Sequence, residues 1–82
     1  MHALQTRASG EAKIAFSIPE KVKEADIYVY SHTGQLVRRF EIQERGYGNV
    51  VLRGSQIAAG SYNCTLVLDG EIKESVKLVK HN

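Results

Sequence analysis

Alternation between apolar and polar side chains is the feature that most constrains the fold of this chain. It is clearest in SYNCTLVLD, residues 61–69, whose apolar row consists of Tyr62, Cys64, Leu66 and Leu68. Successive side chains of a β-strand point to opposite faces, so a period of two residues predicts a strand with one buried face. No stretch keeps a period of about 3.6 residues long enough to predict a helix.

Five further segments that read as strands are separated by turn residues. They lie at residues 11–18, 25–30, 36–42, 49–54 and 72–80. Turn signals recur between them about every 8–12 residues, a spacing that is typical of an all-β sandwich. A chain of 82 residues forms one domain at most. We therefore expect an all-β sandwich of six or seven short strands.

The first ten residues, MHALQTRASG, differ in character from the rest of the chain. Because they are mostly small and polar, we expect residues 1–10 to be a loose linker or an expression remnant, and residues 11–82 to be the sandwich domain. They contain no apolar core with a cleavage site and so predict no signal peptide. No apolar run approaches the roughly 18 residues of a membrane-spanning helix, so no transmembrane segment is expected.

The second and third expected strands are predicted to form a hairpin, because a glycine in their connection supplies the positive φ of a tight turn. If Ile27 pairs with Phe40, the loop contains residues 32–35 and Arg38 falls opposite Val29. Arg38 is then expected near the rim of the sheet. The inner row of the returning strand is expected to hold Leu36, Phe40 and Ile42.

Asp69-Gly70 signals a second hairpin. A two-residue turn there would point lysines inward, and a slip of one residue reverses every face of a strand. Burial therefore favours a three-residue loop, 69–71. The inward row of the last strand is then Ile72, Glu74, Val76 and Leu78, with Glu74 as the misfit, and the outward row is Lys73, Ser75, Lys77 and Val79.

Two other connections are expected. ERGYG, residues 44–48, predicts a turn because of its two glycines. SQIAAG, residues 55–60, predicts a crossover in which Ile57 points inward.

Charge and cysteine content limit the functions and the fold that this chain can have. Eleven basic and nine acidic side chains give a net charge of +2, which is too small and too mixed to favour nucleic acid as a partner. A single cysteine, Cys64, cannot form an internal disulfide, so the fold must hold without one.

No group of residues in the sequence predicts catalysis. A nucleophile and its base would need Cys64 beside a histidine, but Cys64 belongs to an apolar strand row and the histidines lie in a turn or near the chain ends. The histidines show no metal-ligand spacing, and the glycines sit singly in turns instead of in a phosphate-binding loop. We therefore predict no enzyme activity, no catalytic residue, no metal site and no cofactor.

Tyr28 and Tyr30 lie on the expected outer face of their strand. They could form an aromatic contact patch for a sugar or a protein. Aromatic residues on the outer face of a sheet are also ordinary cross-strand packing. The sequence leaves both interpretations open.

The order of several short motifs resembles a known family. A strand that ends in proline, residues 14–19, precedes an alternating strand, residues 27–30, and a polar turn with glycine, residues 33–35. A Gly60-Ser61-Tyr62 element and a final Lys77-Leu78-Val79-Lys80 strand follow. Together, over nearly the whole domain, these motifs resemble the C-terminal sorting domain of proteins exported by the type IX secretion system of Bacteroidetes.

The resemblance implies a seven-stranded, immunoglobulin-like antiparallel β-sandwich without catalysis, carried at the C-terminal end of a larger secreted protein. The outer-membrane secretion machinery would recognise the domain after passage through the periplasm. A sortase would cleave within or before residues 1–10 and attach the cargo to the cell surface through lipopolysaccharide. Recognition would rest on Gly60, Tyr62, Lys77 and Lys80.

The alternative is a structural or ligand-contact sandwich of an extracellular adhesin, glycan-processing or fibre-like protein, with Tyr28 and Tyr30 as its contact patch. In either case Tyr62 is expected to bury its ring while its hydroxyl bonds a backbone group, as in the tyrosine corner of immunoglobulin-type domains. The lysines of the last strand are expected to shield its edge. The same edge could accept a partner's strand.

Overall fold

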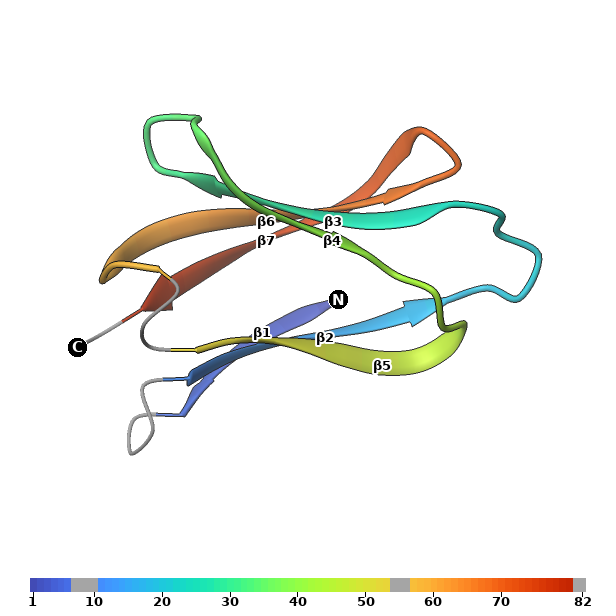
Figure 1. The fold of residues 1–82 in the computed structure, drawn as a ribbon, viewed down its shortest axis with the longest axis horizontal. Helices are drawn as coiled ribbons and strands as arrows, with labels where there is room; N and C mark the ends of the chain where they lie inside the picture. The colour runs from blue at the N-terminus through green and yellow to red at the C-terminus, as the bar shows by residue number, and fades with distance from the viewer. Residues whose placement is uncertain (7–10, 54–56, 81–82) are drawn as a thin grey trace.

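The computed structural model describes residues 1–6, 11–53 and 57–80. Its strands form two sheets that face each other, as Figure 1 shows. The strands are β1 (His2–Thr6), β2 (Glu11–Ile18), β3 (Ala25–Ser31), β4 (Leu36–Glu41), β5 (Gly46–Leu52), β6 (Gly60–Leu68) and β7 (Glu71–Lys80). No described residue lies in a helix. The predicted all-β sandwich is therefore confirmed.

One sheet has the strand order β1-β2-β5 and the other has the order β4-β3-β6-β7. Every neighbouring pair is antiparallel. In the constant-type immunoglobulin domain the fourth strand joins the sheet of the first, second and fifth strands. Here β4 pairs with β3 instead, so the four-stranded sheet gains a strand and presents a wider outer face.

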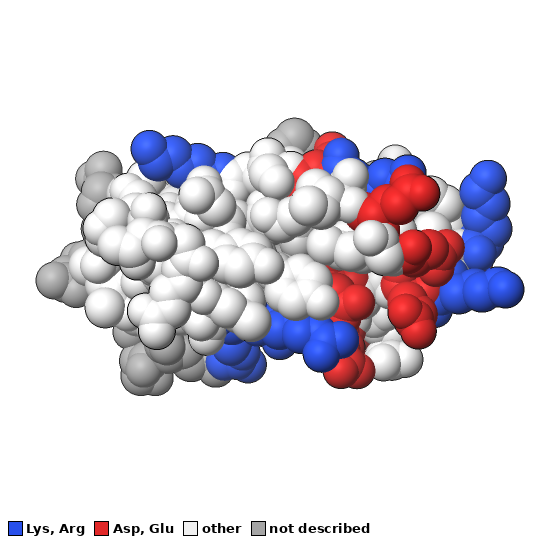
Figure 2. All heavy atoms as spheres, turned by 90° about the horizontal axis from the view of Figure 1, so that it is seen from above, with Lys and Arg blue, Asp and Glu red and all other residues white. Residues whose placement is uncertain are grey.

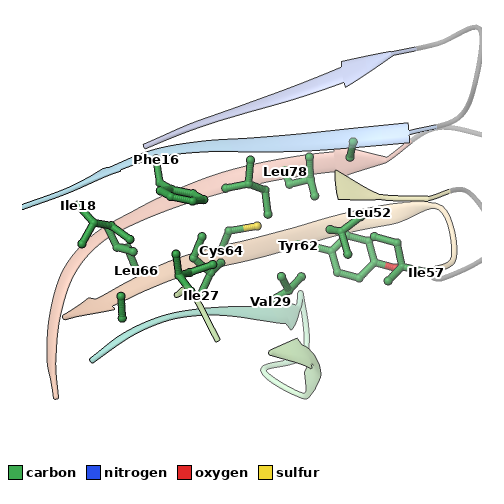
Figure 3. Packing of buried hydrophobic residues seen from close by; sticks show 14 of the residues in the cluster. Phe16, Ile18, Ile27, Val29, Leu52, Ile57, Tyr62, Cys64, Leu66 and Leu78 are labelled. Atoms are coloured by element: carbon green, nitrogen blue, oxygen red, sulfur yellow. The ribbon is translucent and has the colours of Figure 1, made fainter. Parts of the chain in front are cut away.

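The core is filled by the inward rows that the alternation predicted. It includes Ile14, Phe16 and Ile18 of β2, Ile27 and Val29 of β3, Ile57, and Tyr62, Cys64, Leu66 and Leu68 of β6. Figure 3 shows these side chains meeting between the two layers. Each large apolar side chain contributes roughly 1.5–3 kcal/mol by leaving water, before the loss of conformational freedom. The rest of the predicted crossover before Ile57 lies outside the described residues.

The start of β5 corrects one prediction. The sequence predicts a turn over residues 44–48, but β5 begins at Gly46. Gly48 lies opposite Phe16, and a Cβ atom at Gly48 would lie 2.8 Å from Cζ of the Phe16 ring. Gly48 therefore lets the Phe16 ring lie against the β5 backbone. The glycine is needed for this packing inside a strand and does not mark a turn.

The hairpin of β3 and β4 follows the predicted pairing only in part. Val29 pairs with Arg38, as predicted, but a bulge then shifts the register and Tyr30 pairs with Leu36. The predicted inward position of Leu36 is wrong, since 49% of its surface is exposed. Arg38 lies with its guanidinium carbon 4.9 Å from the centroid of the Phe40 ring.

The tip of the hairpin of β6 and β7 also differs from the prediction. Leu68 pairs with Glu71, so the turn contains only Asp69 and Gly70 and the predicted three-residue loop is wrong. Both turn residues have positive φ, 49° for Asp69 and 81° for Gly70. Two positive φ angles are typical of the tight hairpin turn that Asp-Gly favours, so local turn chemistry decided the tip.

A bulge then restores the predicted register in the rest of this hairpin. It falls between Leu66 and Val67, and beyond it Leu66 lies opposite Glu74, as predicted. Before the bulge, Ile72 pairs with Val67 and is 72% exposed, so its predicted place in the core is wrong. The bulge reconciles a two-residue turn with inward burial of Leu78.

Residues 2–6, which the sequence assigns to a linker, form β1 and pair with residues 11–15 of β2. The sandwich therefore begins before the expected boundary, while residues 7–10 lie outside the described residues. The Met1 amino group lies 2.9 Å from Oε2 of Glu74, so the misfit carboxylate of the inward row has a positive partner.

Candidate recognition surface

The candidate site is the outer face of the four-stranded sheet. Alternation along β3, β6 and β7 turns every second residue away from the core, and the register aligns these residues in rows. One row is Tyr30, Asn63 and Lys77, and the next is Tyr28, Thr65 and Ser75. We call these six residues the tyrosine face. Both tyrosines thus lie outward, as predicted.

The tyrosine face presents aromatic surface bordered by hydrogen-bonding groups. The rings of Tyr28 and Tyr30 are half-buried, with centroids 6.2 Å apart and planes inclined by 21°. The hydroxyls of Thr65 and Ser75 lie 3.2 Å apart, within hydrogen-bond distance. An aromatic body beside polar groups is characteristic of surfaces that contact ligands or proteins.

Arg39 forms one border of this face. Its guanidinium carbon lies 5.7 Å from the Tyr28 ring centroid, and its Nε and Nη2 donate to Asp26 Oδ1 at 3.2 and 3.1 Å. The hydrogen bond and the charge of Asp26 raise the pKa of Arg39. A second carboxylate oxygen, Oε1 of Glu41, lies 3.6 Å from Nη2 of Arg39. The charge of Arg39 is therefore largely balanced by its neighbours.

A hollow of about 560 Å³ lies at the opposite border of the face. Its lining consists of His32, Gly60, Ser61, Tyr62, Asn63 and Lys77, and we call it the Lys77 hollow. Three of the four residues that the resemblance singles out, Gly60, Tyr62 and Lys77, thus lie together. Among the described residues, no acidic side chain pairs with Lys77.

Acidic side chains gather at the other end of this face. Figure 2 shows them toward the right, the end at which Figure 1 places the β2–β3 connection and the β6–β7 turn. Most of the remaining surface in this view is uncharged, with basic side chains along its margins. One end of the face is therefore acidic, whereas the hollow at the other end has no acidic side chain in its lining.

Tyr62 shapes the Lys77 hollow from within the core. Only 7% of its surface is exposed, and its hydroxyl donates to the carbonyl oxygen of Ala58 at 2.5 Å. The predicted tyrosine corner is therefore confirmed: the aromatic ring is buried and the phenol closes the turn that enters β6. Gly60, with φ of 151°, adopts a backbone conformation that favours glycine in this turn.

Lys80 does not belong to the exposed group. It pairs with Gly60 across the β6–β7 ladder, but it lies on the inward row of β7 and only 4% of its surface is exposed. Lys77, three residues earlier, points outward beside Asn63. The family resemblance treated the two lysines alike, whereas the pleat of the strand separates them.

The sequence interpretation missed Asn63 and His32 as parts of the hollow. The register that it favoured for the last hairpin already pairs Asn63 with Lys77, so the row could have been found. The predicted loop of residues 32–35 does place His32 in the β3–β4 turn, between Ser31 and Leu36, but its position beside β6 and β7 depends on the packing of this turn.

Arg45 organises the acidic end of the molecule. Its guanidinium donates to backbone carbonyls of two connections, including Val22 at 2.8 Å, Lys23 at 3.0 Å and Glu44 at 2.9 Å. It lines a polar hollow of about 380 Å³ together with Arg39 and several acidic residues. One side chain thus supplies donors to the carbonyl oxygens of two connections, of which those of Val22 and Ile42 are partly buried.

Asp69 ties the β6–β7 turn to the same connection. Its Oδ1 accepts hydrogen bonds from the backbone amides of Lys23 at 2.9 Å and Glu24 at 2.8 Å. Its own amide donates to the Glu24 carbonyl at 2.8 Å. The charged and polar groups of this end are therefore engaged in holding loops together.

Cys64 does not provide a nucleophile. Its side chain is fully buried, and burial raises the pKa of its thiol from 9.0 to about 11. The reactive form of cysteine is the thiolate, so the thiol stays protonated and inert near neutral pH.

Two further properties of the described residues bear on function. Among residues 1–6, 11–53 and 57–80, no three histidine, cysteine or acidic residues gather as metal ligands would. Over these same segments, no helix has the length and apolar character needed to cross a membrane.

Fold and surface together define a class of protein: a small antiparallel β-sandwich whose four-stranded sheet presents stacked tyrosines and polar groups on its outer face. No family model matches the chain, and no curated protein or solved structure matches it either. Any assignment of function therefore depends on the residues and contacts described above.

Proposed function

We propose that this chain is a non-catalytic C-terminal sorting and anchoring module, which directs a larger protein through the type IX secretion system to the cell surface. Its partners are the outer-membrane secretion machinery and a sortase. The proposal starts from the resemblance of the motifs and adds the positions of those motifs in the fold.

The observation that carries the proposal is the pairing of two distant motifs. The Gly60-Ser61-Tyr62 element pairs directly with Leu78, Val79 and Lys80, the end of the final motif. Segments nearly twenty residues apart in the chain thus form adjacent strands at one end of the sheet. A receptor could therefore read both motifs as one surface.

Within this surface the residues have different roles. Lys77 points outward and can touch a receptor, while Tyr62 is buried and holds the turn that shapes the hollow. Lys80 lies inward, so its contribution is to the folded end of β7 instead of to direct contact. Direct recognition is therefore assigned to Lys77 and to the exposed backbone at Gly60.

The test is export of a reporter cargo fused to the chain in a bacterium that has this secretion system. Deletion of β7 is not diagnostic, because it removes Leu78 from the core and so unfolds the domain. Lys77→Glu reverses one outward charge and leaves the core unchanged. We expect this variant to leave cargo in the periplasm, measured by cell fractionation and surface labelling.

Lys13→Glu is the matched control, since Lys13 is an exposed lysine on β2 of the other sheet. It makes the same charge change far from the proposed surface, and we expect normal surface display. Equal display of both variants, each folded as judged by circular dichroism, would reject the sorting proposal.

A second candidate function is a ligand-contact module of an extracellular protein, in which the tyrosine face is the contact. The stacked Tyr28 and Tyr30 favour it, because both rings remain half-exposed on a face that no other element covers among the described residues. This candidate predicts that Tyr30→Ala weakens ligand binding while export of a fused cargo is unchanged.

A further inference from the structure

We propose that the Lys77 hollow, together with the adjoining Tyr30 ring, binds an acidic carbohydrate: a pyranose unit packs on Tyr30 and its carboxylate meets Lys77. This inference rests on the second candidate function, the ligand-contact module, and specifies its ligand class. It assigns polar contacts of the sugar to Asn63 and Ser61.

Charge is the first step of the argument. The hollow is lined by one lysine, one histidine and neutral residues, and no acidic side chain takes part. Among the described residues Lys77 has no ion-pair partner, whereas Arg39, at the other border of the face, pairs with both Asp26 and Glu41. An unpaired cation in a concave site attracts an anionic group and forms a charge-assisted hydrogen bond with it.

The second step is the chemistry next to this charge. Tyr30 lies directly opposite Asn63, and Asn63 lies directly opposite Lys77, so the three side chains form one continuous row. The C–H groups on one side of a pyranose ring carry a small positive charge and pack well against the negative face of an aromatic ring. Amide and hydroxyl groups, here Asn63 and Ser61, suit the hydroxyls at the rim of the sugar.

The third step is the shape of the site. A volume of about 560 Å³ is within the range of roughly 300–1,000 Å³ that is usual for small-ligand sites. The row crosses the face of the sheet over β3, β6 and β7. An acidic peptide that added itself as a strand would pair along β7, the edge strand of this sheet, and would leave Tyr30, two strands away on β3, unused. A bare phosphate would meet Lys77 but would leave Tyr30 unused. The combination therefore favours a sugar that carries a carboxylate.

The experiment is a titration of the isotope-labelled 82-residue chain, followed by amide chemical shifts. The probes are a glucuronic acid tetrasaccharide, the glucose tetrasaccharide of the same linkage, tetraglutamate and inorganic phosphate. The two sugars differ only in the carboxylate. We expect saturable shifts at Tyr30, Asn63 and Lys77 with the acidic sugar, with a Kd on the order of 1 mM or tighter. Binding of the neutral sugar should be about tenfold weaker or worse.

Two variants locate the site. Lys77→Met removes the charge but keeps most of the side-chain length, and we expect about a tenfold loss of affinity for the acidic sugar. Lys13→Met makes the same change on the other sheet and should bind as the unmodified chain does. Amide shifts of each variant without ligand check the fold. If they change only near the substitution, the variant stays folded.

Three results would overturn the inference. Equal affinity for tetraglutamate would assign the site to acidic peptides, and equal affinity for phosphate would reduce it to a simple anion site. Absence of saturable shifts with either sugar would remove carbohydrate binding altogether. The sorting proposal is judged separately by export of the fused cargo, so failure of one does not decide the other.

Discussion

The two ends of the four-stranded sheet use polar residues in opposite ways. At the acidic end, Arg45 and Asp69 satisfy backbone groups of neighbouring connections. At the other end, the Tyr62 hydroxyl bonds the Ala58 carbonyl and so shapes the hollow, and Lys77 has no acidic partner among the described residues. The comparison teaches that charged groups can serve to hold loops together, as Arg45 and Asp69 do. The Lys77 hollow has fewer charged groups, but its lysine has no acidic partner and is available to a ligand.

Replacement of Arg45 by alanine tests the structural end and should have the largest effect. Several carbonyls would lose a charged donor, so we expect the free energy of unfolding to fall by about 2–4 kcal/mol in urea titration. Arg39→Ala is the matched control, because Arg39 bonds a carboxylate at the surface and should contribute under about 1 kcal/mol. Similar losses for both arginines would contradict the assigned role of Arg45.

The core between the two ends should respond to alkaline pH. Burial raises the pKa of Cys64 to about 11 from 9.0, so the unfolded chain releases the thiol proton first as pH rises. Cys64 therefore contributes stability below pH 9 that is lost as pH rises through 9 to 11, by about 2–3 kcal/mol.

Cys64→Val is the comparison for this pH effect, since valine fills similar space without a titrating group. The unfolding free energy of the unmodified chain should fall relative to that of the variant as pH rises through this window, measured by urea titration at each pH. A constant difference would show that thiol burial does not control it.

Tyr62→Phe tests the other end and should have a smaller effect. The ring stays in the core, while the hydrogen bond to the Ala58 carbonyl is lost, so we expect a loss of about 1 kcal/mol. Tyr28→Phe on the tyrosine face should change stability by less than about 0.5 kcal/mol. If the two variants were equally stable, the tyrosine corner would have no role in holding the hollow.

Sequence reasoning predicted the strands well where a long alternating row met the core. Residues 11–18 and the row of Tyr62, Cys64, Leu66 and Leu68 are confirmed, because a half-buried strand needs this pattern in any sandwich. It failed at Gly48, where a glycine serves an aromatic ring on a neighbouring strand. It also failed at Leu36 and Ile72, because a bulge changes the face of a residue without leaving a local signal.

The candidate site was predicted residue by residue but not as a whole. Tyr28, Tyr30, Tyr62 and Lys77 were singled out, yet the sequence did not join them to Asn63, Ser61 or His32. Cross-strand neighbours depend on register, and register depends on both hairpin turns and both bulges.

The sequence by itself determined that this chain is all β, which rows face the core, and that its only cysteine forms no internal disulfide. These properties follow from side-chain period and composition, which are local. Only the tertiary structure decided that Leu36 and Ile72 turn outward, and that Arg45 joins two connections. Such outcomes depend on which strands meet and at what offset, because backbone groups far apart in the chain must find partners in the folded state.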